Sequence, residues 1–231
     1  MFYKDWNLIY NKILKNLKLN REKDKLAADI LNKLLINKKR VSLEKIKKII
    51  ENKEVIVFGA GPSLESSITK NKDRFFNKIK ISADGATSAL LKKNILPDII
   101  ITDLDGNIKD QMKSNQNGSI VVIHAHGDNI EKLTSHIIDF KGEIIGSTQI
   151  NPEPFENLYN FGGFTDGDRA IFFADFFNAK KIYITGFDFD GSIGKYSFSK
   201  KKDKEMKLKK LKWCKYLLDI LKKEKKNIQE L

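Results

Sequence analysis

Apolar residues recur at helical spacing through the first part of this chain. They form three stripes, at residues 2–17, 26–35 and 43–50. Ser42 stands immediately before the third stripe, and its side chain is one of those preferred at a helix N-cap. Residues 1–53 are therefore expected to form an N-terminal helical region.

From residue 54 onward, short apolar runs alternate with intervals of helix length. The predicted strands are residues 55–58, 79–83, 99–102, 120–124, 143–145 and 181–185. This alternation is typical of a largely parallel sheet with right-handed crossovers. The fold class expected for residues 54–231 is therefore α/β, a mostly parallel open sheet with flanking helices. A long loop over residues 151–164 interrupts the pattern, and a long Lys-rich C-terminal helix is expected to close the domain.

Two carboxylates follow the third predicted strand. Ile99 to Ile101 is an unbroken β-branched run, and Asp103 and Asp105 come directly after it. Acids in this position lie where open α/β sheets bind ligands. Two such charges about 4 Å apart repel by about 4 kcal/mol at an effective dielectric constant of 20, which favours a cation between them. Mg²⁺ accepts one or two carboxylates together with water and substrate phosphates. A turn at Asp105-Gly106 with solvated acids explains these residues equally well.

Acids also follow three other predicted strands. Asp84 follows the second strand, Asp128 the fourth, and residues 188–190 contain two more after the last. Because the carboxyl ends of parallel strands share one edge, these acids predict a negative cleft that holds cations. His124 and His126 lie on one strand face, but three His and one Cys in the whole chain make a tetrahedral zinc site improbable. We expect one histidine to be packed and the other to contact substrate.

The first predicted strand leads into a glycine-containing turn. Gly59 and Gly61 lack side-chain bulk, Pro62 suits a first helical position, and the hydroxyl of Ser63 stands next to it. Exposed N–H groups at such a helix start suit a phosphate. The turn resembles half of a dinucleotide-binding fingerprint with Leu64 in place of the third glycine, and no Gly-Lys-Ser/Thr follows as in a Walker A motif. A plain strand-to-helix turn remains the alternative.

A second glycine-rich segment, residues 162–170, follows the long loop and opens a helix. Thr165 or Asp166 suits a helix cap, and Arg169 suits a salt bridge one turn further on. The alternative is functional, because the planar guanidinium of Arg169 matches phosphate oxygens. Lys195 offers a second positive contact.

The net charge of +13 is unevenly distributed. Residues 1–54 carry 15 basic and 7 acidic side chains, residues 199–231 carry 13 and 5, and residues 55–198 carry 15 and 18. Because the excess Lys lies on amphipathic helices at the two ends, we do not expect nucleic acid as a partner. Cys214 is the only cysteine, which fits a reducing cytoplasm, and no apolar run is long enough to span a bilayer.

Five motifs together resemble the archaeal 6-hydroxymethyl-7,8-dihydropterin pyrophosphokinases. They are Gly-Pro-Ser-Leu at 61–64, Ala-Asp-Gly-Ala at 83–86, Pro-Asp-Ile-Ile-Ile-Thr-Asp-Leu-Asp-Gly at 97–106, His-Ala-His-Gly-Asp-Asn at 124–129 and Gly-Gly-Phe-Thr-Asp-Gly-Asp-Arg-Ala at 162–170. That family is similar in turn to thiamine pyrophosphokinases. The resemblance runs from about residue 54 to residue 198 and implies a thiamine-pyrophosphokinase-like catalytic domain over residues 54–231, including the C-terminal helix. It assigns no role to the helical N-terminal region or the Lys-rich tail.

The resemblance and the residue patterns described above together predict the site residues. Asp103 and Asp105 would bind Mg²⁺, which bridges the phosphates of ATP, the co-substrate. The catalytic candidates are Asp128, which would orient or deprotonate the acceptor alcohol, and Arg169, which would hold phosphate oxygens. The candidates for binding ATP or the acceptor are Gly59, Gly61, Pro62, Ser63, Asp84, Gly85, His126, Gly127, Asn129, Thr165, Asp166 and Lys195.

The implied reaction moves a diphosphate from ATP to the hydroxymethyl group of the pterin and releases AMP, in tetrahydromethanopterin or folate biosynthesis. Positioning and charge neutralisation would supply most of the catalysis. Thiamine as acceptor is the closest alternative, followed by a sugar-nucleotide transferase of the flagellin-glycosylation type and by a basic nucleic-acid binder. A homodimer is expected from the resemblance to thiamine pyrophosphokinases.

Overall fold

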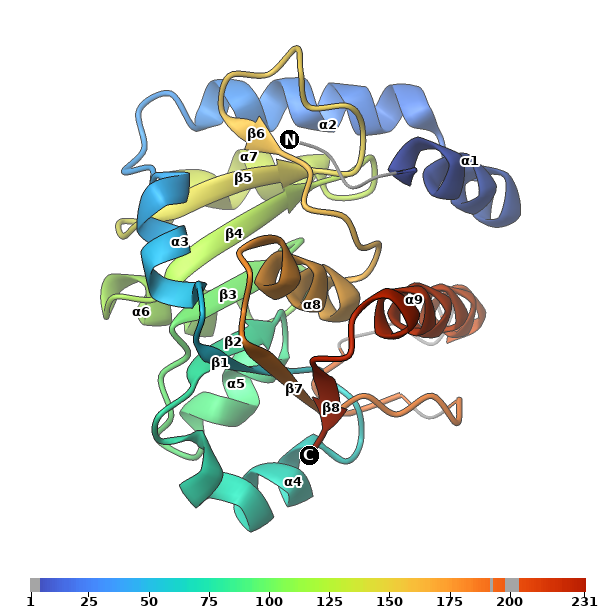
Figure 1. Ribbon diagram of the computed structural model, residues 1–231. Helices are drawn as coiled ribbons and strands as arrows, with labels where there is room; N and C mark the ends of the chain where they lie inside the picture. The colour runs from blue at the N-terminus through green and yellow to red at the C-terminus, as the bar shows by residue number, and fades with distance from the viewer. Residues whose placement is uncertain (1–4, 192, 198–203) are drawn as a thin grey trace.

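The chain folds around one open parallel sheet (Figure 1). The computed structural model describes residues 5–191, 193–197 and 204–231. Within these residues the sheet has eight strands in the order β6-β5-β4-β3-β2-β1-β7-β8, and every neighbouring pair is parallel. The strands are β1 Glu54–Phe58, β2 Ile79–Ala83, β3 Ile99–Thr102, β4 Ile120–Ala125, β5 Ile144–Thr148, β6 Leu158–Tyr159, β7 Lys181–Thr185 and β8 Ile228–Glu230. The expected α/β class with a parallel open sheet is confirmed.

Helices cover both faces of the sheet. The α-helices are α1 Trp6–Leu17, α2 Arg21–Leu34, α3 Leu43–Ile50, α4 Leu64–Asn71, α5 Ala86–Leu91, α6 Ile108–Gln116, α7 Ile130–His136, α8 Asp166–Phe176 and α9 Lys204–Glu224, with 3-10 turns η1 Lys72–Phe75 and η2 Ile137–Asp139. Helices α1, α3, α8 and α9 share one apolar core with one face of the sheet. The opposite face packs against α2, α6 and α7 towards β5, and against α4 and α5 at β1.

Strand β1 is apolar almost throughout because it is buried on both faces of the sheet. Val55 and Val57 belong to the core under α8, whereas Ile56 and Phe58 belong to the core under α4. Successive side chains of a strand point to opposite faces, so a sheet covered on both sides needs apolar residues on both faces of each central strand.

Two short strands lie outside the predicted set. Strand β6 is two residues long and lies inside the segment expected to be the long loop 151–164, and β8 follows the C-terminal helix. Neither has the apolar run that identifies a strand in a sequence. Pairing with a longer neighbour places them, as when Ile182 of β7 lies opposite Ile228 of β8.

The N-terminal helices pack directly on the sheet. Ser42 caps α3 as predicted, since its Oγ accepts a hydrogen bond from the Lys45 N–H at 3.2 Å. Trp6, Tyr10 and Ile13 of α1 are fully buried in the core that also holds residues of β1–β5 and β7. The division of the chain at residue 53 into a helical region and an α/β domain stays a prediction.

Helix α8 occupies the position that matters most for the site. It follows β6 at one edge of the sheet and crosses back over β3, β2 and β1 towards β7 (Figure 1). The crossing brings its first residue to the carboxyl end of β2 and β3. None of the described helices combines the length and apolarity needed to cross a bilayer.

Candidate active site

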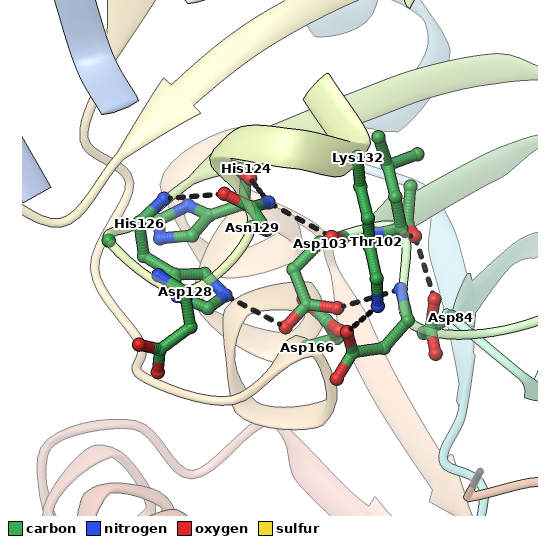
Figure 2. Close-up of polar contacts among 12 residues, drawn as sticks. Asp84, Thr102, Asp103, His124, His126, Asp128, Asn129, Lys132 and Asp166 are labelled. Atoms are coloured by element: carbon green, nitrogen blue, oxygen red, sulfur yellow. Dashed lines mark hydrogen bonds and ion pairs between the residues drawn. The ribbon is translucent and has the colours of Figure 1, made fainter. Parts of the chain in front are cut away.

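Three carboxylates from separate parts of the chain meet at the carboxyl edge of the sheet (Figure 2). Asp84 follows β2, Asp103 follows β3 and Asp166 begins α8. One oxygen of each lies within 4.8 Å of the others. Among the described residues, these three side chains form the group that could bind a metal ion jointly. We call this group the acid cluster.

The three carboxylates of the acid cluster have perturbed pKa values. Burial, followed by the charge of Asp103, raises the pKa of Asp84 to about 6. Burial and the same charge also raise the pKa of Asp166 well above its ordinary value, against the opposing charge of Arg169. Burial alone would raise the pKa of Asp103, but the hydrogen bond and charge of His126 together with the charge of Arg169 hold it below its ordinary value. Asp103 is therefore the permanently ionised member.

Three hydrogen-bond donors hold the side chain of Asp84 in place. Its Oδ1 accepts hydrogen bonds from Thr102 Oγ1 at 2.7 Å, Gln111 Nε2 at 2.9 Å and the Gly106 N–H at 3.0 Å. Asp84 also has a positive φ of 44°, a region that aspartate tolerates better than most residues. These bonds saturate one carboxylate oxygen, which leaves Oδ2 as the oxygen available to a cation.

The two acids of the Asp-Leu-Asp motif differ in burial and in their partners. Leu104 has a φ of 67°, so the backbone turns between Asp103 and Asp105 instead of continuing as a strand. Asp103 is buried in the acid cluster. Asp105 is exposed, forms an ion pair with Lys132 and is not a member of the cluster. The structure thus joins Asp103 to Asp84 and Asp166, where the sequence suggested Asp105 as its partner.

The loop after β4 supports Asp103. His126 Nε2 lies 3.1 Å from Asp103 Oδ2, and Asn129 Nδ2 donates to the Asp103 backbone carbonyl at 2.9 Å (Figure 2). The Asn129 side chain also accepts from the His126 N–H at 3.1 Å and donates to the His124 carbonyl at 2.7 Å. The carboxylate of Asp128 is exposed on the same loop and points away from these bonds (Figure 2).

His124 is packed beneath this loop. Its Nδ1 lies 3.0 Å from Ser147 Oγ, and burial, followed by the charge of Arg169, holds its pKa well below the usual value, so the ring is neutral. Within the described part of the chain, His124 Nε2 and Arg169 Nε are both buried without a hydrogen-bond partner. Both residues line a cavity of about 10 Å³, a volume that suits one water molecule.

Arg169 lies one turn into α8 and touches the cluster directly. Its NH1 donates to Asp166 Oδ1 at 3.1 Å and its NH2 donates to Gln149 Oε1 at 3.2 Å. Thr165 forms a capping box with Asp168, whose carboxylate accepts from the Thr165 N–H at 2.8 Å. Thr165 thus caps α8, and Asp166 is freed to face Asp84 and Asp103.

The turn after β1 is closed by an acid from the β7 side. Asp188 Oδ2 accepts hydrogen bonds from the Ser63 N–H at 3.0 Å and from Ser63 Oγ at 2.9 Å. Gly61 and Gly59 are needed here, since a Cβ on Gly61 would lie 2.1 Å from Asp188 Oδ2 and one on Gly59 would lie 2.5 Å from the Gly186 carbonyl. Pro62 lies in the same turn.

The remaining predicted residues fall into two groups. Gly85 follows Asp84 at the start of α5, and Gly127 lies between His126 and Asp128, so both adjoin the site. Lys195 forms an ion pair with Glu65 of α4 and is largely exposed.

Several residues near the cluster were not identified from the sequence, and one of them is a lysine of the C-terminal helix. Lys207 of α9 is half-buried, burial lowers its pKa, and the charges of Asp105, Asp84 and Asp103 oppose that shift. Its Nζ donates to the Ser197 carbonyl at 3.1 Å. No signal in the sequence distinguishes Lys207 from the other lysines of its helix.

The donor set fits a hard divalent cation. Three carboxylates converge, burial followed by mutual repulsion raises the pKa of two of them, and all offered ligands are oxygens, as Mg²⁺ prefers. An open α/β sheet with acids at the carboxyl ends of its strands and with Arg169 beside them suits a ligand that carries phosphate groups. Fold and site together are those of an α/β protein suited to phosphorylated ligands.

Comparison with known proteins identifies the family. Residues 28–194 match the model of the family described as 6-hydroxymethylpterin diphosphokinase MptE-like. Proteins named 6-hydroxymethyl-7,8-dihydropterin pyrophosphokinase are similar over most of their length: one from Methanocaldococcus jannaschii is 44% identical over 96% of both chains, and one from Pyrococcus furiosus is 43% identical over 96% of this chain and 95% of its own. A third, from Methanothermobacter thermautotrophicus, is 41% identical over 83% of this chain and 81% of its own.

This chain belongs to the 6-hydroxymethylpterin diphosphokinase MptE-like family, and it is an enzyme of the diphosphotransferase class. Among solved structures, the MAf glycosyltransferase from Magnetospirillum magneticum AMB-1 has a similar fold, with a TM-score of 0.50 and 15% identity. That match covers 73% of this chain and 27% of the glycosyltransferase chain, so it concerns the fold of one part of a longer protein.

Proposed function

We propose that this protein transfers a diphosphate from ATP to the hydroxymethyl group of 6-hydroxymethyl-7,8-dihydropterin, giving the pterin diphosphate and AMP. One observation carries the proposal: a chain of this family gathers three acids, Asp84, Asp103 and Asp166, at the ligand-binding edge of its sheet. Three relatives named for this activity support the choice of acceptor. The proposal includes a cytoplasmic location and a place in tetrahydromethanopterin or folate biosynthesis.

The acid cluster would hold Mg²⁺ that arrives with ATP. Bound there, the ion would neutralise charge on the phosphates as the transfer proceeds. Asp103 is ionised for this purpose at any physiological pH, and its hydrogen bond to His126 fixes the carboxylate. Asp105 has its own partner in Lys132, so we propose Asp84 and Asp166 as the companions of Asp103.

Positive side chains around the cluster would bind the phosphates. Arg169 is held beside Asp166, and Lys207 approaches the same acids from α9. Both would attract the charge of the polyphosphate. Asp128 stays our candidate for orienting or deprotonating the alcohol, because its carboxylate is exposed on the loop that carries His126.

The experiment that tests the proposal is a product analysis. The protein is incubated with ATP, Mg²⁺ and either 6-hydroxymethyl-7,8-dihydropterin or thiamine, and the nucleotide and acceptor products are separated. We expect AMP and the pterin diphosphate. ADP in place of AMP would contradict diphosphate transfer, and thiamine diphosphate without pterin diphosphate would change the acceptor.

A substitution at Asp103 tests the metal assignment. We expect Asp103→Asn to lower kcat by about a hundredfold or more, since loss of a single transition-state electrostatic contact has effects of that order. AMP release is measured at saturating Mg²⁺, and circular dichroism checks the fold. Asp139→Asn, at an exposed acid outside the site, is the matched control. Near-normal turnover of Asp103→Asn would refute the role of Asp103 as a ligand.

A further inference from the structure

Helix α2 carries a buried acid that no part of the reaction described above uses. Asp24 is 4% exposed, although it lies in the first turn of a helix otherwise rich in exposed charged residues. Both of its oxygens are hydrogen-bonded: Oδ1 accepts from the Gly127 N–H at 2.7 Å, and Oδ2 accepts from Gln149 Nε2 at 2.8 Å and from the Tyr10 hydroxyl. Because burying a carboxylate is unfavourable unless donors surround it, these three bonds are what allow Asp24 to lie here.

The first oxygen of Asp24 holds the loop after β4. Gly127 packs so closely on α2 that a Cβ there would lie 2.5 Å from Lys23 Cβ. Gly127 is flanked by His126, whose ring contacts Asp103, and by Asp128, whose N–H lies 3.3 Å from His126 Nδ1. Helix α2 therefore fixes the position from which His126 reaches the acid cluster.

The second oxygen of Asp24 reaches the cluster by a different route. Gln149 Nε2 donates to Asp24, and its Oε1 accepts from Arg169 NH2 at 3.2 Å. Arg169 in turn donates to Asp166 Oδ1 at 3.1 Å. Gln149 is buried, and its backbone carbonyl accepts from the indole N–H of Trp6 at 2.7 Å, so helix α1 holds the backbone from which this side chain reaches Asp24.

We propose that Asp24 is a positioning residue of the active site, which acts through Gly127 on His126 and through Gln149 on Arg169. Helices α1 and α2 are then part of the catalytic apparatus, because they supply Asp24, Tyr10 and Trp6 to this network. The proposal rests on the proposed function for its activity readout, and on hydrogen bonds alone for its geometry. Outer partners of metal-binding groups typically change metal affinity or activity by about 10–100-fold when they are replaced.

The hydrogen-bond polarity of the network gives a sharp test. Asp24→Asn replaces two acceptor oxygens by one oxygen and one NH₂ group. If the oxygen accepts from the Gly127 N–H, the NH₂ group of the new asparagine faces Gln149 Nε2, and two donors then oppose each other. If Gln149 rotates its amide to accept this hydrogen bond, its own NH₂ group then faces the Arg169 guanidinium. One contact is lost in either arrangement. Gln149→Glu has the opposite fault, because it sets two carboxylates against each other.

The double variant Asp24→Asn/Gln149→Glu restores the pairing. The amide introduced at position 24 would donate to one oxygen of the carboxylate introduced at position 149, and the other oxygen of that carboxylate would accept from Arg169. We expect each single variant to lower kcat and the affinity for Mn²⁺, used as a probe for Mg²⁺, by about tenfold. We expect the double variant to recover both values to within about threefold of the wild type. Asp29→Asn on the same helix is the matched control, with both values unchanged.

Mn²⁺ affinity is measured by titration of the free ion signal in electron paramagnetic resonance, on protein whose folding is checked by thermal unfolding. Additive losses in the double variant, or a single variant that loses thermal stability but keeps Mn²⁺ affinity and kcat, would overturn the positioning role. If the wild type transfers no diphosphate to the pterin, the proposed function fails, while the Mn²⁺ titrations of the same variants still decide the role of Asp24.

Discussion

Leu104 adopts a backbone conformation that leucine rarely adopts. Its φ of 67° lies in the left-handed region, and it is fully buried between Asp103 and Asp105. The hydrogen bond from the Leu104 N–H to Thr102 Oγ1, 2.8 Å long, holds the turn. Because strained backbone persists only where the surroundings impose it, this turn is part of how Asp103 is delivered to the cluster. At this scale, the turn at Leu104 separates the buried Asp103 from the exposed Asp105.

Asp84 makes stability depend on pH in a definite direction. Its pKa is about 6 in the folded chain and near the ordinary 3.8 in the unfolded chain, so the folded state binds the proton more tightly. Without divalent cations, the contribution of the Asp84 proton to stability is fully present below pH 3.8 and is lost as the pH rises towards 6. We expect Asp84→Asn to gain stability relative to the wild type as the pH rises through this range, measured by urea unfolding in EDTA.

When a cation is bound, Asp84→Asn should lose stability relative to the wild type instead of gaining it. Above the pKa of Asp84, Mg²⁺ is expected to raise the melting temperature of the wild type, since a ligand of the folded state stabilises it, and to raise that of Asp84→Asn less. Asp139→Asn serves as the control in both series. An unchanged pH dependence in Asp84→Asn would mean that Asp84 does not carry the raised pKa.

Helix α9 contributes more than a surface covering. Its apolar side packs on the core through Cys214, Leu217, Leu218 and Leu221, and its N-terminal half places Lys207 within the field of the acids. One lysine of the basic C-terminal residues therefore lies close enough to the acids to interact with them electrostatically. A role for Lys207 in phosphate binding depends on how α9 packs.

A substitution on α9 tests this role. We expect Lys207→Met to raise the KM for ATP by about tenfold, equivalent to about 1.4 kcal/mol, because a positive charge near the phosphates is lost. Steady-state kinetics with the pterin at saturation measure the effect. Lys215→Met, at an exposed position of the same helix, should leave KM unchanged. Equal KM values for the two variants would remove Lys207 from the site.

On the scale of the whole molecule, the first helices and the sheet share a core. Trp6, Tyr10 and Ile13 belong to the same buried cluster as residues of the central strands, and Asp24 bonds to the loop after β4. A helical region that packs in this way should unfold together with the sheet.

A core substitution in α1 tests that coupling. We expect Ile13→Ala to lower the free energy of unfolding by about 2–5 kcal/mol, as large-to-small changes in cores do, within a single transition. Circular dichroism and Trp fluorescence should report the same midpoint. Leu8→Ala, at a position 63% exposed on the same helix, should change stability by less than about 0.5 kcal/mol. A separate early transition in Ile13→Ala would mean that the N-terminal helices fold on their own.

The sequence by itself determined the α/β class, six strands of the sheet, the Ser42 cap and the family. Periodicity and strand-end chemistry are local, so residues such as Asp84 and Asp103 are visible in the order of the chain. Only the tertiary structure decided that Asp166, and not Asp105, meets them, since that depends on the turn at Leu104 and on the path of α8 across the sheet. It also decided the place of Asp24, an acid of α2 whose partners Gly127 and Gln149 lie more than a hundred residues away. Contacts of that range leave no periodic trace, because they follow from how whole elements pack.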